Sequence, residues 1–193
     1  MIQQDISIEL QQAINESPYN QIDYDYLLAH NPAQIRIEEQ QLADTEEPLA
    51  IPEGLVVENL EIPSRELHRT IRLRTYRPLG QSNLPVLMYF HGGAFIYGTP
   101  EQYDFIFYPM AIALNILIVS VDYRLAPEHP FPAALEDAYD ALLWVAQEAG
   151  QLGGNKESIS IGGSSAGGTI AASLAHLARD KQEVVLQHQY LLY

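Results

Sequence analysis

Residues 158–168 constrain the fold more than any other stretch of this chain. They read Ser-Ile-Ser-Ile-Gly-Gly-Ser-Ser-Ala-Gly-Gly, so apolar and polar residues alternate up to Ile161, as in a β-strand. Glycines then lead into a small apolar helix that is predicted to begin near Ala166. A strand that turns directly into a helix has no room for large side chains at the turn. The stretch therefore predicts a tight strand-turn-helix unit with a serine at its tip.

The serine at the tip is Ser165. Gly163-Ser164-Ser165-Ala166-Gly167 fits the pattern G-x-S-x-G, whereas a motif centred on Ser164 would have Ala166 in place of its second glycine. The pattern exposes a serine Oγ at a helix N-terminus, where free N–H groups favour developing negative charge. Ser165 is therefore the candidate nucleophile. For the pentapeptide alone, a plain glycine turn is an equally good interpretation.

A second glycine-containing segment lies upstream. The apolar run 86–90 predicts a buried central strand, and His91-Gly92-Gly93-Ala94-Phe95 follows it directly. An acyl-transfer site needs backbone N–H donors aimed at the oxyanion, and glycines let a loop bring these groups close. The candidate oxyanion-hole residues are Gly92, Gly93 and Ala94, together with Ala166 after the candidate nucleophile.

The rest of the chain predicts strands and helices in alternation. Strands are expected at 55–62, 67–77, 116–121 and 184–193, and helices at 102–114 and 135–149. With the strand-turn-helix unit, this order predicts an α/β fold with a doubly wound, mostly parallel sheet and Ser165 at the carboxyl edge of a strand. Alternating arginines between residues 69 and 77 indicate a half-buried edge strand and not a basic binding patch.

The N-terminal region differs from the rest. Residues 1–50 are glutamine-rich and read as helical, and Asn31-Pro32-Ala33-Gln34 predicts a helix start with Asn31 as N-cap and Gln34 at the capping-box position. Pro48, Pro52 and Gly54 mark the end of the region. We therefore expect a helical cap segment at 1–50 and the α/β core at 51–193, with ordinary helical packing as the alternative to a cap.

Composition excludes several classes of function. The net charge of −15 argues against nucleic acid or an anionic membrane as partner. The chain has no cysteine, which excludes disulfides and cysteine-ligated metals, and we expect neither a cofactor nor a metal. No signal peptide and no apolar run long enough to span a bilayer is visible, so a cytoplasmic location is predicted.

Three segments together resemble one family. They are His91 to Phe95, Gly163 to Gly168, and the run 122–134, which reads Asp-Tyr-Arg-Leu-Ala-Pro-Glu-His-Pro-Phe-Pro-Ala-Ala. The chain is similar over residues 55–193 to the hormone-sensitive lipase branch of the α/β-hydrolases, the fold-3 carboxylesterases. This resemblance implies a serine hydrolase of short to medium acyl esters, a small-molecule ester as substrate, no cofactor, and an N-terminal helical cap over the site.

Two positions depart from the family pattern. Ala94 stands where the family usually has a third glycine, and Ser164 stands where aspartate is common. Because the oxyanion donors are backbone groups, we expect both departures to matter little. The substrate-binding residues cannot be assigned from the sequence.

A larger departure concerns the general base. In this fold the acid and the histidine of the triad follow the serine, and Ser165 is 28 residues from the end of this sequence. None of the chain's histidines is well placed to act as the base, since His176 lies about 16 Å along the predicted helix and His188 falls within an apparent strand. We therefore expect an esterase core whose C-terminal part is missing, with self-association through the strand edge at 184–193.

Two functions follow as hypotheses. In the first, the protein is an ester hydrolase, with Ser165 as nucleophile and the histidine and acid supplied by another segment or chain. In the second, it is an inactive fragment or a relative that binds a small molecule without turnover. Amide hydrolysis uses the same groups and remains a third possibility.

Overall fold

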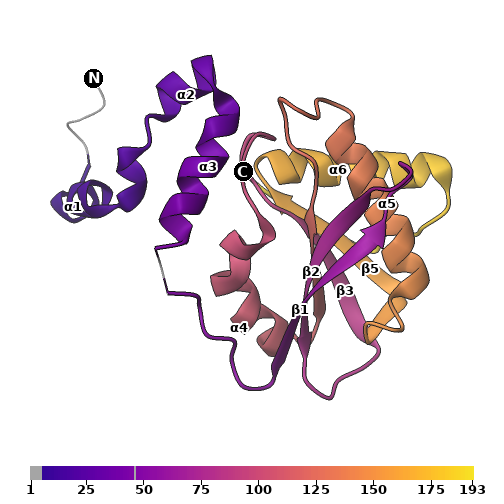
Figure 1. Cartoon of the computed structure of the whole chain (residues 1–193). Coiled ribbons are helices and arrows are strands. Elements are labelled where there is room, and N and C mark those ends of the chain that lie inside the picture. Colours follow the sequence, from indigo (N-terminus) through magenta and orange to yellow (C-terminus); the bar gives the residue numbers. More distant parts are fainter. Residues whose placement is uncertain (1–5, 46) are drawn as a thin grey trace. The chain divides into compact units, whose positions relative to one another are not determined.

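The computed structural model describes residues 6–45 and 47–193, and the chain divides into two compact units, Met1–Pro48 and Leu49–Tyr193. The first unit is helical (Figure 1). Its elements are α1 (Ile8–Glu16), the short 3-10 helix η1 (Pro18–Gln21), α2 (Tyr24–His30) and α3 (Pro32–Ala43). Tyr24 of α2 donates a hydrogen bond of 2.9 Å to Glu39 of α3, which joins these two helices. The role of this unit as a cap stays a prediction.

The start of α3 corrects one detail of the sequence prediction. Asn31 is the N-cap residue and Pro32 occupies the first turn, as predicted, but the Asn31 side chain makes no capping hydrogen bond. The backbone N–H of Gln34 instead donates to the backbone oxygen of Asn31 at 3.0 Å. Asn31 has φ −153° and ψ 69°, away from the extended backbone usual for an N-cap residue. The predicted capping box is therefore wrong.

The second unit is built around a six-stranded sheet. Its strands are β1 (Leu55–Pro63), β2 (Thr70–Pro78), β3 (Leu84–Phe90), β4 (Leu117–Asp122), β5 (Gly154–Ser164) and β6 (Gln189–Leu192). The strand order is β1-β2-β4-β3-β5-β6. The pairs β1–β2 and β2–β4 are antiparallel, whereas β3–β4, β3–β5 and β5–β6 are parallel. The sheet is thus mostly parallel, as the sequence predicts.

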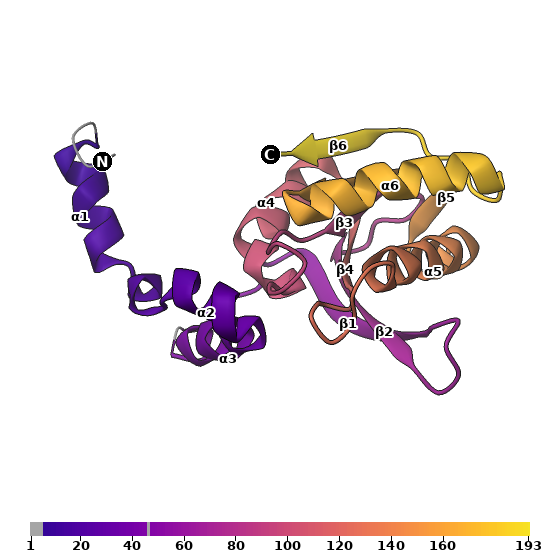
Figure 2. The same cartoon turned by 90° about the horizontal axis from the view of Figure 1, so that it is seen from above.

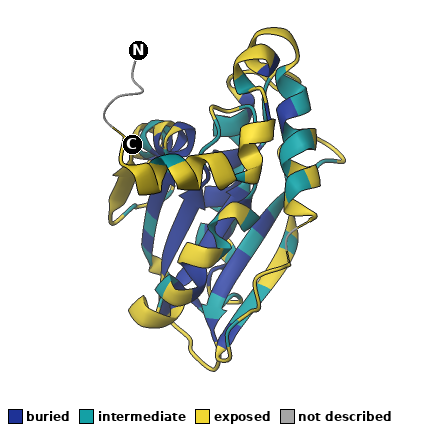
Figure 3. Cartoon of the chain, turned by 90° about the vertical axis from the view of Figure 1, so that its left-hand side faces the viewer, coloured by how far each residue is buried: buried dark blue, intermediate teal, exposed yellow. Residues whose placement is uncertain are grey.

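Helices cover both faces of this sheet (Figure 2). They are α4 (Asp104–Leu114), which follows the 3-10 helix η2 (Pro100–Tyr103), α5 (Ala133–Glu148) and α6 (Ala166–Lys181). Helices α5 and α6 pack on one face and α4 packs on the other. The central strands are mostly buried, whereas much of the outer helix surface is exposed (Figure 3). The structure confirms the predicted doubly wound α/β architecture.

Strand β3 shows why the apolar run 86–90 predicts a buried central strand. Val86, Met88 and Phe90 point into the core under α5 and α6, and Leu87 and Tyr89 point into the core under α4. A central parallel strand is covered on both faces, so both sets of alternating positions are apolar. This strand ends beside the end of β5, where the candidate nucleophile follows.

The arginines of β2 form ion pairs within the fold. The guanidinium of Arg72 contacts Asp122 at 2.9 Å and also bonds Glu101, and Arg74 donates to Asp104 at 2.9 Å. These carboxylates raise the pKa of both arginines, against an opposing effect of burial. The prediction that these arginines are structural is confirmed for both residues. The predicted edge position is wrong, because β2 pairs with β1 on one side and with β4 on the other.

The last strand is shorter than the sequence predicts. Strand β6 spans Gln189–Leu192, so the predicted strand at 184–193 is wrong in its first half. Helix α6 ends at Lys181, and its C-cap residue Gln182 has left-handed backbone. Val184 and Leu186 then pack against the core while the chain crosses to the sheet edge. All four residues of β6 are exposed. In the described part of the chain, no helix has both the length and the apolar character needed to cross a membrane.

Candidate active site

Ser165 lies at the turn between β5 and α6. Its backbone has φ 51° and ψ −117°, a conformation that residues with a Cβ atom rarely adopt. Ser165 is exposed, and its side chain makes no capping hydrogen bond to α6. Strained backbone of this kind persists where the surrounding structure enforces it, and it is concentrated at functional sites. The turn therefore presents a free hydroxyl group at the N-terminus of a 16-residue helix.

The two glycines of the motif allow close backbone packing. A Cβ atom at Gly163 would collide with the backbone of Gly167 and lie 2.8 Å from the nitrogen of Gly168. A Cβ atom at Gly167 would collide with the backbone oxygens of Phe90 and His91. Glycine at these two positions thus lets α6 start directly against both β5 and the end of β3.

The elbow is also joined to the edge strand. The backbone N–H of Ser165 donates to the backbone oxygen of Leu192 at 2.7 Å, and Ser164 pairs with Leu192 in the β5–β6 ladder. The position of Ser165 therefore depends on β3 on one side and β6 on the other.

The predicted oxyanion loop begins next to the elbow. Phe90, the last residue of β3, pairs with Gly163 of β5, so His91 and Ser164 follow this pair side by side. The loop then runs through left-handed backbone at Gly93, Ala94 and Phe95, with φ values of 120°, 51° and 63°. The backbone oxygen of Gly93 accepts hydrogen bonds from the next turn, so the loop closes on itself. The sequence thus forms a tight loop at the carboxyl edge of the sheet.

The four predicted donors differ in their surroundings. The N–H of Gly92 donates to the hydroxyl of Tyr103 at 3.2 Å. Within Leu49–Tyr193, no hydrogen bond occupies the N–H groups of Gly93, Ala94 or Ala166. Ala166 is the first residue of α6 and is buried. Three of the four predicted donors therefore have no hydrogen-bond partner within this unit, and the fourth is held by a tyrosine.

His91 is a buried structural residue of the loop. Its Nδ1 lies 2.7 Å from the backbone oxygen of Gly92. Because a carbonyl oxygen only accepts, Nδ1 carries the proton, and the buried Nε2 has no partner in the described part of the chain. Burial lowers the pKa of His91 to about 4. The ring is therefore neutral at pH 7, and its Nδ1 proton is used within its own loop.

The segment after β4 is hydrogen-bonded to the oxyanion loop. Tyr123 donates a hydrogen bond of 2.7 Å to the backbone oxygen of His91, and Ala126 N–H donates to the backbone oxygen of Phe95 at 2.8 Å. The adjacent Arg124 bonds the fully buried carboxylate of Asp137 through both its backbone N–H (3.0 Å) and its Nε (3.1 Å). The segment 122–134 thus positions the loop, a role that its sequence alone does not reveal.

Tyr103 and the side chain of Ser164 were missed by the sequence prediction. The two hydroxyl groups are hydrogen-bonded to each other, and Tyr103 also accepts from Gly92. The contact joins residues 61 positions apart, and no local pattern at Tyr103 signals it. The only sequence hint is that Ser164 stands where the resembling family commonly has aspartate.

The histidines of Leu49–Tyr193 are either exposed or bonded elsewhere. Within Leu49–Tyr193, none of the histidine side chains is hydrogen-bonded to the Ser165 hydroxyl. His176 is exposed on α6, and His188 is exposed before β6 with its Nδ1 3.4 Å from the Oγ of Ser160. Since His188 precedes β6, the expectation that it lies inside a strand is wrong. In the described part of the chain, no three acidic or histidine side chains are grouped as a metal site would require.

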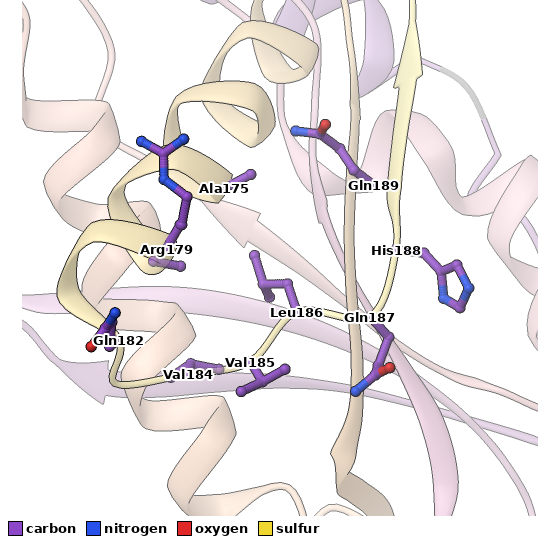
Figure 4. A pocket seen from close by; sticks show the side chains of 10 residues that line it. Ala175, Arg179, Gln182, Val184, Val185, Leu186, Gln187, His188 and Gln189 are labelled. Carbon is purple, nitrogen blue, oxygen red and sulfur yellow. The ribbon is translucent and has the colours of Figure 1, made fainter.

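A cavity of about 450 Å³ lies at the opposite end of α6 (Figure 4). Ala175 and Arg179 of α6 line it together with Val184, Leu186 and other residues of the segment that leads into β6. Ser165 precedes the first residue of the same helix. The cavity is therefore not part of the candidate active site.

Comparison with known families places this geometry in context. A family model described as the alpha/beta hydrolase fold matches residues 87–193, more than half of the chain. The matched region includes the oxyanion loop, the segment 122–134 and the elbow.

Individual relatives are esterases. The chain is 44% identical over 124 residues to carboxylesterase NlhH of Mycobacterium tuberculosis, a match that covers 64% of this chain and 39% of the relative. It is 38% identical over 133 residues to an arylesterase of Saccharolobus solfataricus, covering 69% of this chain and 44% of that protein. Among solved structures, a hyperthermophilic esterase from the archaeon Pyrobaculum calidifontis matches with a TM-score of 0.77 and 37% identity, covering 95% of this chain and 57% of that one.

The chain is much shorter than these proteins. It spans 39% and 44% of the two curated relatives and 57% of the archaeal esterase. The shared part carries the elbow and the oxyanion loop, so these two features can be compared directly.

Proposed function

Because this chain belongs to the α/β-hydrolase fold family, we propose that it acts on carboxylic esters with short to medium acyl groups and that Ser165 is its nucleophile. The observation that carries the proposal is the conformation of Ser165, whose free hydroxyl is exposed at the N-terminus of α6. The oxyanion loop leaves the neighbouring strand, and three predicted donors have no hydrogen-bond partner within Leu49–Tyr193. The esterase names of the relatives support the same reaction class.

The proposed chemistry begins with attack of the Ser165 Oγ on the acyl carbonyl carbon. The carbonyl oxygen becomes an oxyanion, and the N–H groups of Gly93, Ala94 and Ala166 donate to it. Gly92 would contribute a further donor only if its N–H left the Tyr103 hydroxyl. Collapse of the tetrahedral intermediate breaks the ester bond, releases the alcohol and leaves an acyl-serine that water hydrolyses.

The reaction requires a general base. A serine hydroxyl is a weak nucleophile at neutral pH unless a histidine takes its proton. Since Leu49–Tyr193 places no histidine on the Ser165 hydroxyl, the proposal includes a histidine and a carboxylate supplied by a further polypeptide segment.

The test compares hydrolysis of 4-nitrophenyl butyrate by the wild-type chain and by Ser165→Ala. We expect the variant to lose at least about 99% of any enzyme-dependent rate, because the triad serine acts with its partners as a unit. The matched control is Ser173→Ala, which removes a hydroxyl two turns along the same helix and should leave the rate unchanged. A fluorophosphonate probe followed by mass spectrometry should label Ser165. Equal rates for wild type and Ser165→Ala, with no labelling of Ser165, would contradict the proposal.

A second function is favoured by the absence, within Leu49–Tyr193, of a histidine hydrogen-bonded to the Ser165 hydroxyl. A family member whose serine lacks a base can hold a small molecule near the elbow without turnover. This alternative predicts saturable binding of an ester or carboxylate ligand in a calorimetric titration, with no product formed. Binding that is weakened by Ser165→Ala and unaccompanied by hydrolysis would support it over the esterase.

Two further proposals concern self-association and cellular location. The exposure of all four residues of β6, with Tyr190 50% exposed, supports self-association through this sheet edge. Concentration-dependent sedimentation that is abolished by Leu191→Lys would support it. The cytoplasmic location also stays a prediction.

A further inference from the structure

We infer that Tyr103 is a positioning residue of the proposed active site, because its hydroxyl group joins Gly92 of the oxyanion loop to Ser164 of the elbow. The inference deepens the proposed function and depends on it for its catalytic consequence. The link itself is a structural statement that can be tested without any turnover.

The contacts place the Tyr103 hydroxyl group between the two segments, and the hydroxyl of Tyr89 interacts with both Tyr103 and Ser164. Tyr103 accepts a hydrogen bond of 3.2 Å from the backbone N–H of Gly92 and is also hydrogen-bonded to the Oγ of Ser164. The segments are close enough for this link, since a Cβ atom built on Gly92 would lie 3.1 Å from the Ser164 Oγ and 3.5 Å from the Tyr103 hydroxyl. Each linked residue is the direct neighbour of a proposed functional residue, Gly93 or Ser165.

The ring of Tyr103 is itself held in place. It packs against Tyr89 of β3 with centroids 5.0 Å apart and stacks on Phe107 of α4 at 5.5 Å. Tyr103 ends η2 and is the N-cap residue of α4, so its backbone is fixed by two helical elements. A hydroxyl group on an ordered ring loses little conformational entropy when it bonds, which makes it an effective spacer.

The Tyr103 link would fix the distance between the Ser165 hydroxyl and the N–H groups of the oxyanion loop. Catalytic groups must be held within about 0.5 Å of the productive geometry, and supporting hydrogen bonds normally provide this precision. The oxyanion loop is the part of this site most in need of support, because Ala94 and Phe95 both adopt left-handed backbone without being glycine. Tyr103 ties the base of that loop to the strand end that carries Ser165.

The experiment compares Tyr103→Phe, Ser164→Ala and the double variant with wild type. Tyr108→Phe is the matched control, since it removes a hydroxyl that bonds Asp104 at 2.9 Å on the adjacent helix α4 and does not contact Gly92 or Ser164. The first readout is amide hydrogen exchange at Gly92, measured by NMR. The second is the rate at which a fluorophosphonate labels Ser165, divided into its binding and reaction steps.

We expect Tyr103→Phe to speed exchange at Gly92 by about threefold to tenfold, as the loss of one hydrogen bond implies. The double variant should match Tyr103→Phe, because both changes act on one network. The labelling reaction step should slow by a similar factor while the binding step changes little, and Tyr108→Phe should behave like wild type in both measurements.

The outcomes separate the inference from the proposed function. If the wild type is not labelled, the esterase proposal fails, and the exchange measurement still tests the link. Unchanged exchange at Gly92 in Tyr103→Phe would overturn the inference, as would an equal increase in Tyr108→Phe. Faster exchange with an unchanged labelling reaction step would overturn the positioning role.

Discussion

The hydroxyl group of Tyr123 donates a 2.7 Å hydrogen bond to the backbone oxygen of His91, and the two rings stack with centroids 4.3 Å apart and planes inclined by 14°. Both residues are buried, and the pair connects β4 to the first residue of the proposed oxyanion loop. Because burial raises the pKa of Tyr123, its hydroxyl stays protonated and remains a donor.

We expect Tyr123→Phe to lower the free energy of unfolding by about 1 to 2 kcal/mol. The substitution keeps the stacked ring but leaves the buried oxygen of His91 without this donor. Urea denaturation measures the change. Tyr190→Phe is the control, since its ring is half exposed and its hydroxyl makes no hydrogen bond within Leu49–Tyr193. Equal stability of Tyr123→Phe and wild type would show that the hydrogen bond contributes nothing.

The buried imidazole of His91 makes stability depend on pH. Burial lowers its pKa in the folded protein to about 4, whereas an unfolded histidine titrates near 6.5. Between these values the unfolded chain binds a proton that the folded chain does not, so stability falls as the pH is lowered. The contribution is fully present above pH 6.5, and about 2 kcal/mol of it is lost at pH 5.

Two measurements check this dependence. The free energy of unfolding at pH 7.5 and at pH 5 should differ less in His91→Asn than in wild type, because asparagine keeps an N–H near the Nδ1 position and does not titrate. If that variant does not fold, an NMR titration of the His91 ring in wild type gives the answer. A midpoint for His91 near 6.5 in the folded protein would contradict the prediction.

The candidate site could be located from the sequence because each of its two main parts is a short, continuous segment of the chain. The elbow and the oxyanion loop are short segments in which glycine is required by backbone collisions, as at Gly163 and Gly167, and such requirements leave a readable pattern. The strands that carry them are continuous apolar runs, so the order of elements was readable as well.

Contacts between distant segments left no such pattern. Tyr103 bonds Ser164, which lies 61 positions away in the sequence, and Tyr123 bonds His91, which lies 32 positions away. Nothing in the residues around either tyrosine specifies its partner. The predicted strand at 184–193 failed for a related reason. Val184 and Leu186 are apolar because they pack on the core as a connection, which a periodic pattern does not distinguish from a strand.

The glycine at position 167 should tolerate no side chain. In Gly167→Ala the new methyl group would meet the backbone oxygens of Phe90 and His91, which belong to the sheet and its loop and cannot move independently. We expect a loss of about 3 kcal/mol or more in the free energy of unfolding. Gly150→Ala is the control, since nothing lies within 4 Å of a Cβ atom there, and it should be neutral or stabilising by up to about 1 kcal/mol. Thermal denaturation that ranks the two variants equally would contradict the packing argument.

Replacing Ala94 by glycine should stabilise the folded protein. The residue has φ 51°, and a left-handed conformation costs an L-residue about 1 to 2 kcal/mol, whereas glycine adopts it freely at a smaller entropic cost. Its side chain is exposed, so its removal forfeits little buried surface.

We therefore expect Ala94→Gly to raise the free energy of unfolding by about 0.5 to 1 kcal/mol, measured by urea denaturation. Ala146→Gly is the matched control, because the same change inside α5 should cost about 1 kcal/mol. A gain in stability at position 94 would identify backbone strain as the cause, since the same change at Ala146 loses helix propensity and core packing. A loss of stability in both would mean that the left-handed backbone at Ala94 carries no strain that glycine can relieve.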